Sequence, residues 1–204
     1  MDEQVLVSTR RALHGGAESV IAGPQYRADG TIRLKVTPDG FAGVTSPLRV
    51  QGMELVGPDG RWPLGGTLRE LASAAGVDVG PPKGLYSDSS GVDPDEPLTF
   101  DAGAVKLLED WFARGDAALR AFAPESAPVL WPEHFDLGIS LDEVNYGVSP
   151  GDPGYPRPYA YVVPWTPGEG EFWNVPFGAM RWADELPDAA AVAAFFAEGR
   201  HRAG

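Results

Sequence analysis

Alternating hydrophobic and polar positions predict several short strands along this chain. In residues 31–36 three apolar side chains alternate with Arg33 and Lys35, which is the period of a half-buried strand. The tripeptides Pro38-Asp39-Gly40 and Pro58-Asp59-Gly60 each follow an apolar segment. Proline and the αL-tolerant residues Asp and Gly favour tight turns, so each tripeptide predicts a hairpin.

The last third of the chain shows the same pattern more strongly. Residues 134–141 alternate without a break, with Phe135 and Leu137 on one side and His134 and Asp136 on the other. Further strands are predicted at 144–148 and 159–163, and one or two more within 172–182. Because the connections between sequential strands are short, an antiparallel meander is expected.

Helices are predicted where apolar residues recur every three or four positions. Residues 2–22 have such a stripe, weakened by Gly15 and Gly16. Thr67-Leu-Arg-Glu70 is a capping box that predicts a short helix. Asp101 can cap a further helix, and a final helix begins near residue 188, with His201 in a frayed tail.

These elements predict an α+β fold in one domain, residues 1–204, with helices packed on one face of an antiparallel sheet. Residues 1–125 supply a helix, hairpins and further helices, whereas residues 126–204 supply the meander, the C-terminal helix and the candidate site. Residues 77–100 are rich in Gly, Pro, Asp and Ser, which predicts a long loop or lid.

Composition excludes several classes of function. The 204 residues contain 16 Lys plus Arg against 29 Asp plus Glu, a net charge of −13. This excess disfavours nucleic acid and anionic membranes, because both are bound mainly through Lys and Arg. No apolar run approaches the roughly 18 residues of a spanning helix. The acidic start, Met-Asp-Glu-Gln, and the absence of cysteine predict a cytoplasmic location.

Aromatic and acidic residues gather in residues 121–180. This stretch holds 11 of the 21 aromatic residues, both asparagines, and eight acidic residues against Arg157 alone. Aromatic rings and carboxylates suit an acidic pocket for a polar or cationic small molecule, although large aromatics also form ordinary cores. The expected binding residues are Trp131, Glu133, Asn145, Tyr146, Asp152, Tyr161, Trp165, Trp173 and Asn174.

Catalytic chemistry is expected from His134, Asp136 and Glu143. A two-residue step along a strand places His134 and Asp136 about 7 Å apart on one face, so an imidazole and a carboxylate can converge on a third group, and Glu143 can act as a base. The alternative is that His134 is a polar residue on the solvated face of a strand.

Two other functions stay open. His14 and Glu18 share a helix face, and with His134 and Asp136 they could hold a divalent metal for a metal-assisted enzyme; otherwise no cofactor is indicated. An exposed aromatic face could instead dock another protein. Gly147-x-Ser149-x-Gly151 matches a nucleophile elbow, but Pro150 has no N–H for an oxyanion hole, so a serine hydrolase is rejected. The sequence identifies neither the substrate nor the oligomeric state.

Four strings of residues resemble a family of uncharacterised bacterial proteins common in actinobacteria. They are Leu130-Trp-Pro-Glu-His-Phe-Asp-Leu137, Tyr146-Gly-Val-Ser-Pro-Gly-Asp152, Pro158-Tyr-Ala-Tyr-Val-Val-Pro-Trp165 and Phe172-Trp-Asn-Val-Pro-Phe-Gly-Ala179. The similarity covers roughly residues 128–200 and implies no activity. It implies only that this stretch is a recurring unit.

Overall fold

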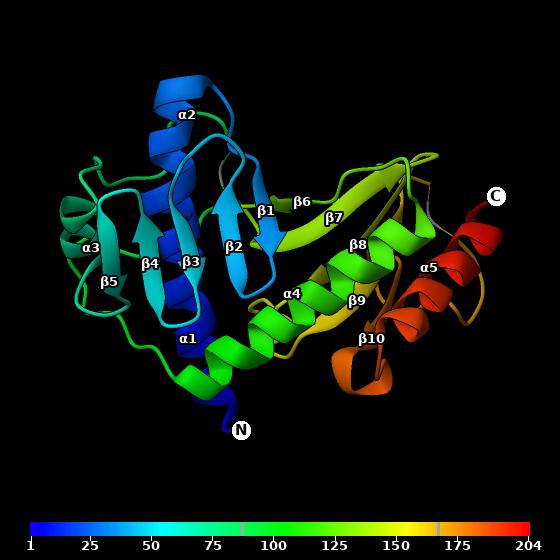
Figure 1. Cartoon of the computed structure of the whole chain (residues 1–204). Coiled ribbons are helices and arrows are strands. Elements are labelled where there is room, and N and C mark those ends of the chain that lie inside the picture. Colours follow the sequence, from blue (N-terminus) through cyan, green and yellow to red (C-terminus); the bar gives the residue numbers. More distant parts are fainter. Residues whose placement is uncertain (87, 167) are drawn as a thin grey trace. The chain divides into compact units, whose positions relative to one another are not determined.

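The computed structural model describes residues 1–86, 88–166 and 168–204, which form two compact units. The first unit contains Met1–Asp110 and Leu130–Phe135, and the second contains Trp111–Val129 and Asp136–Gly204. Each unit combines helices with an antiparallel sheet (Figure 1), so the predicted α+β fold is confirmed.

The sheet of the first unit has the order β6-β1-β2-β3-β4-β5, in which β1 to β5 form an antiparallel meander and β6 pairs with β1. Both predicted Pro-Asp hairpins are confirmed, because the strand pairs close at Thr37↔Gly40 and Gly57↔Gly60. The strands are β1 (Leu34–Thr37), β2 (Gly40–Gly43), β3 (Arg49–Gln51), β4 (Glu54–Gly57), β5 (Gly60–Pro63) and β6 (Val129–Trp131).

A long helical segment packs on this sheet. It consists of α1 (Glu3–Gly16), the π-helix η1 (Ala17–Ala22) and α2 (Gly23–Asp29), drawn in blue in Figure 1. All six residues of η1 are buried, and η1 contacts β2. The predicted end at residue 22 was wrong, because the helical backbone continues through Gly23 and Pro24 until Gly30 adopts a left-handed conformation (φ 72°).

The remaining elements of the first unit follow the sheet in sequence. The capping box opens α3 (Leu68–Ala74), as predicted, because Thr67 and Glu70 exchange both hydrogen bonds. The described residues of 77–100 form no helix or strand, which agrees with the predicted loop; Ser87 of that loop lies outside the described residues. Asp101 then accepts a hydrogen bond from Ala104 at the start of α4 (Ala102–Phe122).

The second unit contains the antiparallel sheet β10-β9-β8-β7. Its strands are β7 (Asp136–Leu141), β8 (Val144–Ser149), β9 (Tyr159–Pro164) and β10 (Ala179–Trp182). The predicted strand at 134–141 begins too early, because residues 132–135 form a turn in which Phe135 has φ 53°. His134 is therefore a turn residue and does not share a strand face with Asp136.

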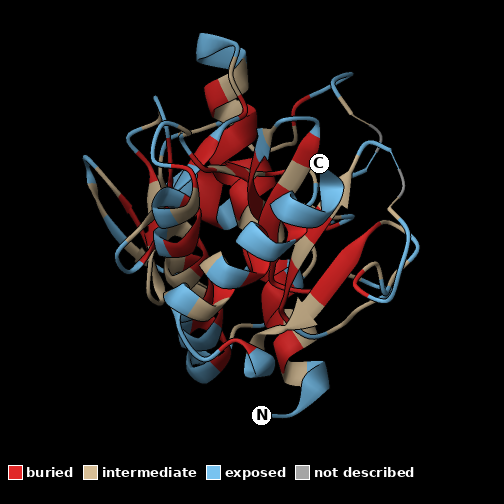
Figure 2. Cartoon of the chain, turned by 90° about the vertical axis from the view of Figure 1, so that its right-hand side faces the viewer, coloured by how far each residue is buried: buried red, intermediate tan, exposed pale blue. Residues whose placement is uncertain are grey.

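Two helices cover one face of the second sheet. Tyr146 of β8 packs against Phe122 of α4 and Phe196 of α5 (Ala189–Ala203), with ring centroids 4.8 and 6.0 Å away. The predicted apolar face of α5 is buried, whereas its other residues are largely exposed (Figure 2). The α5 helix extends to Ala203, so the prediction that His201 lies in a frayed tail was wrong.

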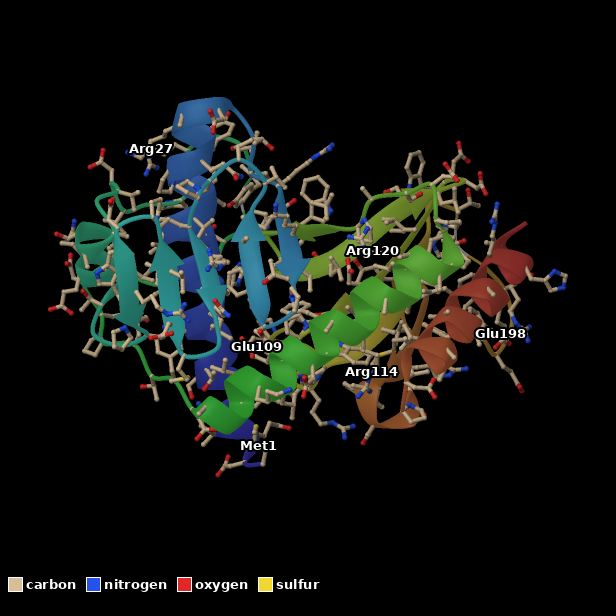
Figure 3. The ribbon with its side chains drawn as sticks, in the orientation of Figure 1. Met1, Arg27, Glu109, Arg114, Arg120 and Glu198 are labelled. Carbon is tan, nitrogen blue, oxygen red and sulfur yellow. The ribbon has the colours of Figure 1, made fainter. Side chains whose placement is uncertain are left out.

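Polar contacts complete this packing. Arg114 of α4 donates 2.7 and 3.4 Å hydrogen bonds to the carbonyls of Leu186 and Ala183 (Figure 3). Residue Ala183 lies in the short helix η2 (Ala183–Glu185) between β10 and α5. The Trp111 indole N–H donates a 2.9 Å hydrogen bond to the carbonyl of Ser149, which ties α4 to the end of β8.

Candidate functional site

A buried carboxylate lies in the π-helix of the first unit. Glu18 exposes only 1% of its surface, and it accepts hydrogen bonds from the Tyr86 hydroxyl (3.1 Å), the Ser90 hydroxyl (2.6 Å) and the Ser90 backbone N–H (3.0 Å). Three donors offset much of the cost of burying this charge. A π-turn inside a helix is often found at a functional site, so Glu18 is the centre of the candidate site.

His14 lies one helical turn before Glu18. Its Nε2 is 2.6 Å from the carbonyl oxygen of Pro132, and its ring stacks on Phe135 at 5.5 Å. A carbonyl can only accept, so Nε2 carries the proton and Nδ1 is an acceptor when the ring is neutral. Burial lowers the pKa of His14, and it outweighs the opposing effects of the Pro132 hydrogen bond and the Glu18 carboxylate.

The turn that binds His14 also carries Glu133. The Oε2 atom of Glu133 is shielded from solvent, and among the described residues it has no hydrogen-bond partner. Burial, together with the negative charges of Glu18 and Glu133, raises the pKa of Tyr86 well above its usual range. Both carboxylates are therefore near enough to Tyr86 to act on its phenol, although only Glu18 accepts a hydrogen bond from it.

Two further predicted residues belong to the same part of the first unit. His134 follows Glu133 and is exposed, yet its imidazole is close enough to lower the pKa of His14. Trp131 ends β6, and the Arg33 guanidinium lies 5.8 Å from its ring centroid. The turn that carries Glu133 and His134 is thus bonded, through Pro132, to the helix that carries His14 and Glu18.

The described residues of 77–100, here named the strap, cover this helix. Arg27 of α2 donates hydrogen bonds to the carbonyls of Gly80 (3.1 Å) and Asp78 (Figure 3), and the Gly80 N–H donates to the Ser19 carbonyl at 3.0 Å. A Cβ atom at Gly23 would lie 1.9 Å from the Gly80 oxygen, so this close approach requires glycine. The strap is therefore fastened directly to the π-helical region.

The second unit has a separate group of polar residues on the sheet face opposite its helices. Tyr161 donates a hydrogen bond to Asp136 from two strands away. It reaches Asp136 by lying over Gly147 and Gly138; a Cβ atom at Gly147 would be 2.3 Å from the Tyr161 hydroxyl oxygen. Burial and the Asp136 charge raise the pKa of Tyr161 well above its usual range.

Asp152 has a similar arrangement in the loop after β8. Its Oδ1 accepts hydrogen bonds from the backbone N–H groups of Gly154 and Tyr155, and its Oδ2 accepts a 2.6 Å hydrogen bond from the Tyr159 hydroxyl. Burial and this hydrogen bond raise the pKa of Tyr159. The carboxylates of Asp136 and Asp152 are thus already hydrogen-bonded to tyrosines.

Both predicted asparagines bond to neighbouring protein groups. Asn145 accepts a 2.6 Å hydrogen bond from the Ser140 hydroxyl of the paired strand. The Asn174 amide both donates to the Met180 carbonyl (3.2 Å) and accepts from the Met180 N–H (2.9 Å). Such two-sided bonding to the backbone gives Asn174 a role in shaping the loop before β10.

The other site residues predicted in the second unit do not share one pocket lining; each has its own surroundings. Tyr146 is fully buried between helices, Trp165 is 65% exposed, and Trp173 packs edge-on against Phe172 at 4.9 Å. Glu143 is exposed in the two-residue turn between β7 and β8, where it has φ 62°. Asp136 begins β7, so five strand steps, roughly 17 Å, separate it from the turn that holds Glu143.

Sequence reasoning did not identify Tyr86 and Ser90 as site residues. They are 68 and 72 positions from Glu18, and nothing in a Gly- and Ser-rich segment shows which helix it will cover. Within the described residues, no group of three or more His, Cys, Asp or Glu side chains is placed to hold a metal ion. The first unit therefore offers hydrogen-bonding and proton-transfer groups: carboxylates, a neutral imidazole and a phenol.

Comparisons of the chain with protein-family models, curated proteins and solved structures found no match. The resemblance to an actinobacterial family remains a prediction. Across the described residues, no helix has the length and apolar character needed to cross a bilayer.

Proposed function

We propose that the first unit binds a small polar molecule that presents hydrogen-bond donors, such as amino or hydroxyl groups. The observation that carries this proposal is the Oε2 atom of Glu133, which is shielded from solvent and accepts no hydrogen bond from the described residues. A shielded carboxylate oxygen without a donor is costly, by about 1–3 kcal/mol or more. A ligand that donates to this oxygen would remove that cost.

The neighbouring groups support the same assignment. The long strap covers Glu18 and contributes Tyr86 and Ser90 to it, and loops of this length with no secondary structure are commonly binding loops or lids. In the second unit, by contrast, Asp136 and Asp152 already bond to Tyr161 and Tyr159. Asp116 of the second unit also has a shielded oxygen without a partner, but its other oxygen is ion-paired with Arg120. Glu133 forms no ion pair among the described residues, so the first unit is favoured as the ligand site.

Charge narrows the ligand class. The chain carries −13 overall, and neither Glu18 nor Glu133 forms an ion pair among the described residues. A negative field repels anions, so the proposed ligand is neutral or cationic. The cytoplasmic location expected from the sequence remains part of the proposal. The same field argues against nucleic acid as a partner.

A ligand screen by thermal shift tests this function. Polyols, amines, amino acids and amino sugars are to be screened against the wild-type chain, Glu133→Gln and the control Glu125→Gln, which removes an exposed carboxylate. We expect a saturable rise in Tm with at least one compound, retained in Glu125→Gln and reduced in Glu133→Gln. His134→Ala should leave the Tm without ligand nearly unchanged, because His134 is exposed.

Two results would oppose the proposal. One is that no compound of these classes raises the Tm of the wild-type chain. The other is a hit that stabilises Glu133→Gln as strongly as the wild-type chain, which would place its site elsewhere.

A further inference from the structure

We propose that the loop before β10 keeps this strand from pairing with β10 of a second copy of the chain. The two loop residues that do this, Asn174 and Val175, are here named the edge cap. All of the contacts involved lie within the second unit, so this inference is independent of the ligand proposed for the first unit.

The strand β10 is the last in the sheet order and pairs with β9 on one side. In an antiparallel pair, alternate residues direct their backbone N–H and C=O groups toward the neighbouring strand, and the residues between them direct these groups away from it. Ala183, directly after β10, donates its N–H to the carbonyl of Pro158, just before β9. Counting back from Ala183, the alternation turns the backbone groups of Trp182, Met180 and Gly178 toward the outer edge.

An outer edge of this kind is a template for another strand, and the edge cap occupies it. The Gly178 N–H donates to the Val175 carbonyl at 3.0 Å, and the Val175 N–H donates to the Gly178 carbonyl at 3.1 Å. The Met180 N–H donates to Asn174 Oδ1 at 2.9 Å, and Asn174 Nδ2 donates to the Met180 carbonyl at 3.2 Å. A side-chain amide offers both a donor and an acceptor, so Asn174 takes the place of a backbone residue of a neighbouring strand.

Side chains also meet the rest of this edge. Glu185 in η2 accepts a 2.8 Å hydrogen bond from the Trp182 N–H, and the Arg181 guanidinium donates a further 2.9 Å hydrogen bond to the Met180 carbonyl. The outward N–H groups of Gly178, Met180 and Trp182 are thus all occupied. Because side chains meet Met180 and Trp182, the described part of the sheet ends here without a further strand, which would have a new open edge of its own.

Without the edge cap, the same edge would fit a second copy of this chain. In an antiparallel pair of identical strands related by a two-fold axis, Met180 would lie opposite Met180 of the second copy, and the two residues would exchange both N–H···O bonds. Gly178 of each copy would then lie opposite Trp182 of the other. Such a contact needs the backbone groups that the edge cap and Glu185 occupy, so the two arrangements exclude each other.

The test compares Asn174→Ala with Asn145→Ala, which removes the other asparagine of the chain, a residue bonded to Ser140 of β7. Mass is followed by sedimentation equilibrium from micromolar to near-millimolar concentration at pH 7. About 150 mM KCl shortens the Debye length to about 8 Å, which screens repulsion between two acidic copies. We expect the average mass of Asn174→Ala to rise with concentration toward twice that of the wild-type chain, whereas Asn145→Ala should match the wild-type chain throughout.

Hydrogen exchange locates the contact. In dilute solution the Met180 amide hydrogen should exchange about tenfold faster or more in Asn174→Ala than in the wild-type chain, the effect of losing one hydrogen bond. At high concentration it should become protected again, because Met180 then pairs with the second copy. Asn174→Asp keeps an acceptor for the Met180 N–H and adds a charge to the edge, so its mass should stay that of the wild-type chain.

Two results would overturn the proposal. If folded Asn174→Ala has the mass of the wild-type chain at every concentration, Asn174 only shapes the loop. If it associates while the Met180 amide stays unprotected, the contact lies elsewhere on the chain. Should Asn174→Ala fail to fold, Glu185→Ala opens the same edge from an exposed position, and the same two measurements, with the Trp182 amide as the reporter, decide between these outcomes.

Discussion

Glu18 is buried and His14 is partly buried, and the two residues lie one helical turn apart. Each is held by a different segment of the chain. Glu18 bonds to the strap, whereas His14 bonds to the turn at 132–135. Because each bond joins residues far apart in sequence, these two side chains fasten both segments to the same helix. Their contributions to stability can be measured separately from any ligand.

Replacing the Glu18 carboxylate should destabilise the fold. In Glu18→Gln the amide retains one acceptor oxygen and turns an NH₂ group toward the donors of Tyr86 or Ser90, so at least one shielded donor loses its partner. We expect a loss of about 2–4 kcal/mol in the free energy of unfolding, measured by urea denaturation. Glu125→Gln is the matched control and should change it by less than about 0.5 kcal/mol; similar values for the two variants would show that the Glu18 bonds are weak.

His14 should give the fold a pH dependence. Its pKa is lowered in the folded state, so between that value and the unfolded value of about 6.5 the unfolded chain binds more protons. Stability should therefore rise with pH across this window, and the contribution should be lost as pH falls through the folded pKa. Urea midpoints at pH 5 and 7.5 should differ less in His14→Gln than in the wild-type chain.

The exposed His134 provides the comparison for that experiment. His134→Gln should leave the pH dependence near that of the wild-type chain. A direct NMR titration of His14 should also give a midpoint below 6.5. A midpoint above 6.5 would mean that the Glu18 charge outweighs burial, and the sign of the pH dependence would then reverse.

At the scale of elements, the strap packs closely on the helix beneath it. Val92 of the strap is buried and lies against Gly15 of α1, where a Cβ atom would be 2.9 Å from the Val92 side chain. The adjacent Gly16 has no atom within 4 Å of such a Cβ. These neighbouring glycines therefore differ in packing while sharing a helical backbone.

This difference gives a matched pair of variants. Gly16→Ala should stabilise the chain by about 0.5–1 kcal/mol, because alanine restricts the unfolded chain and favours the helix. Gly15→Ala has the same helical advantage but must displace Val92, so a net loss of about 1–3 kcal/mol is expected. Urea denaturation of both variants measures the contrast, and equal stabilisation by both would show that the strap moves aside freely.

The elements that the sequence pattern predicted well are those defined by local chemistry. The Pro-Asp turns and the Thr67 capping box use neighbouring residues, so a short window contains their cause. The π-turn at Ala17–Ala22 has no such signal, since burial against other elements distinguishes it from an ordinary helix. The left-handed Phe135 was missed because periodicity reports hydrophobicity and carries no information on φ.

The same contrast between local sequence signals and tertiary contacts applies to the candidate site. His14 and Glu18 were paired from their i,i+4 spacing, and Glu133 and His134 were singled out from their local sequence. Tyr86 and Ser90 were not, because the strap reaches Glu18 only through tertiary contacts. Spacing along one element can be read from sequence, whereas convergence of a loop on a helix requires the fold.

At the scale of the whole molecule, the dominant property is the unbalanced charge. Even if all 16 basic residues were paired with acids, 13 of the 29 acidic residues would remain without a partner. The eight ion pairs among the described residues have partly exposed side chains, so each contributes roughly 0–1 kcal/mol. Repulsion among the remaining carboxylates opposes folding.

Salt should therefore stabilise this protein at pH 7. Raising KCl from about 10 mM to about 150 mM shortens the Debye length from about 30 to about 8 Å, which screens repulsion spread over the chain more than contact between adjacent ions. We expect Tm to rise by about 2–4 °C, equivalent to about 1 kcal/mol, and then to level off.

A fall in Tm over this range would mean that the surface ion pairs outweigh the repulsion. A steady linear rise to molar salt would instead indicate exclusion of salt from apolar surface. Choline chloride, a quaternary ammonium salt without N–H donors, should reproduce the KCl curve if screening alone is responsible.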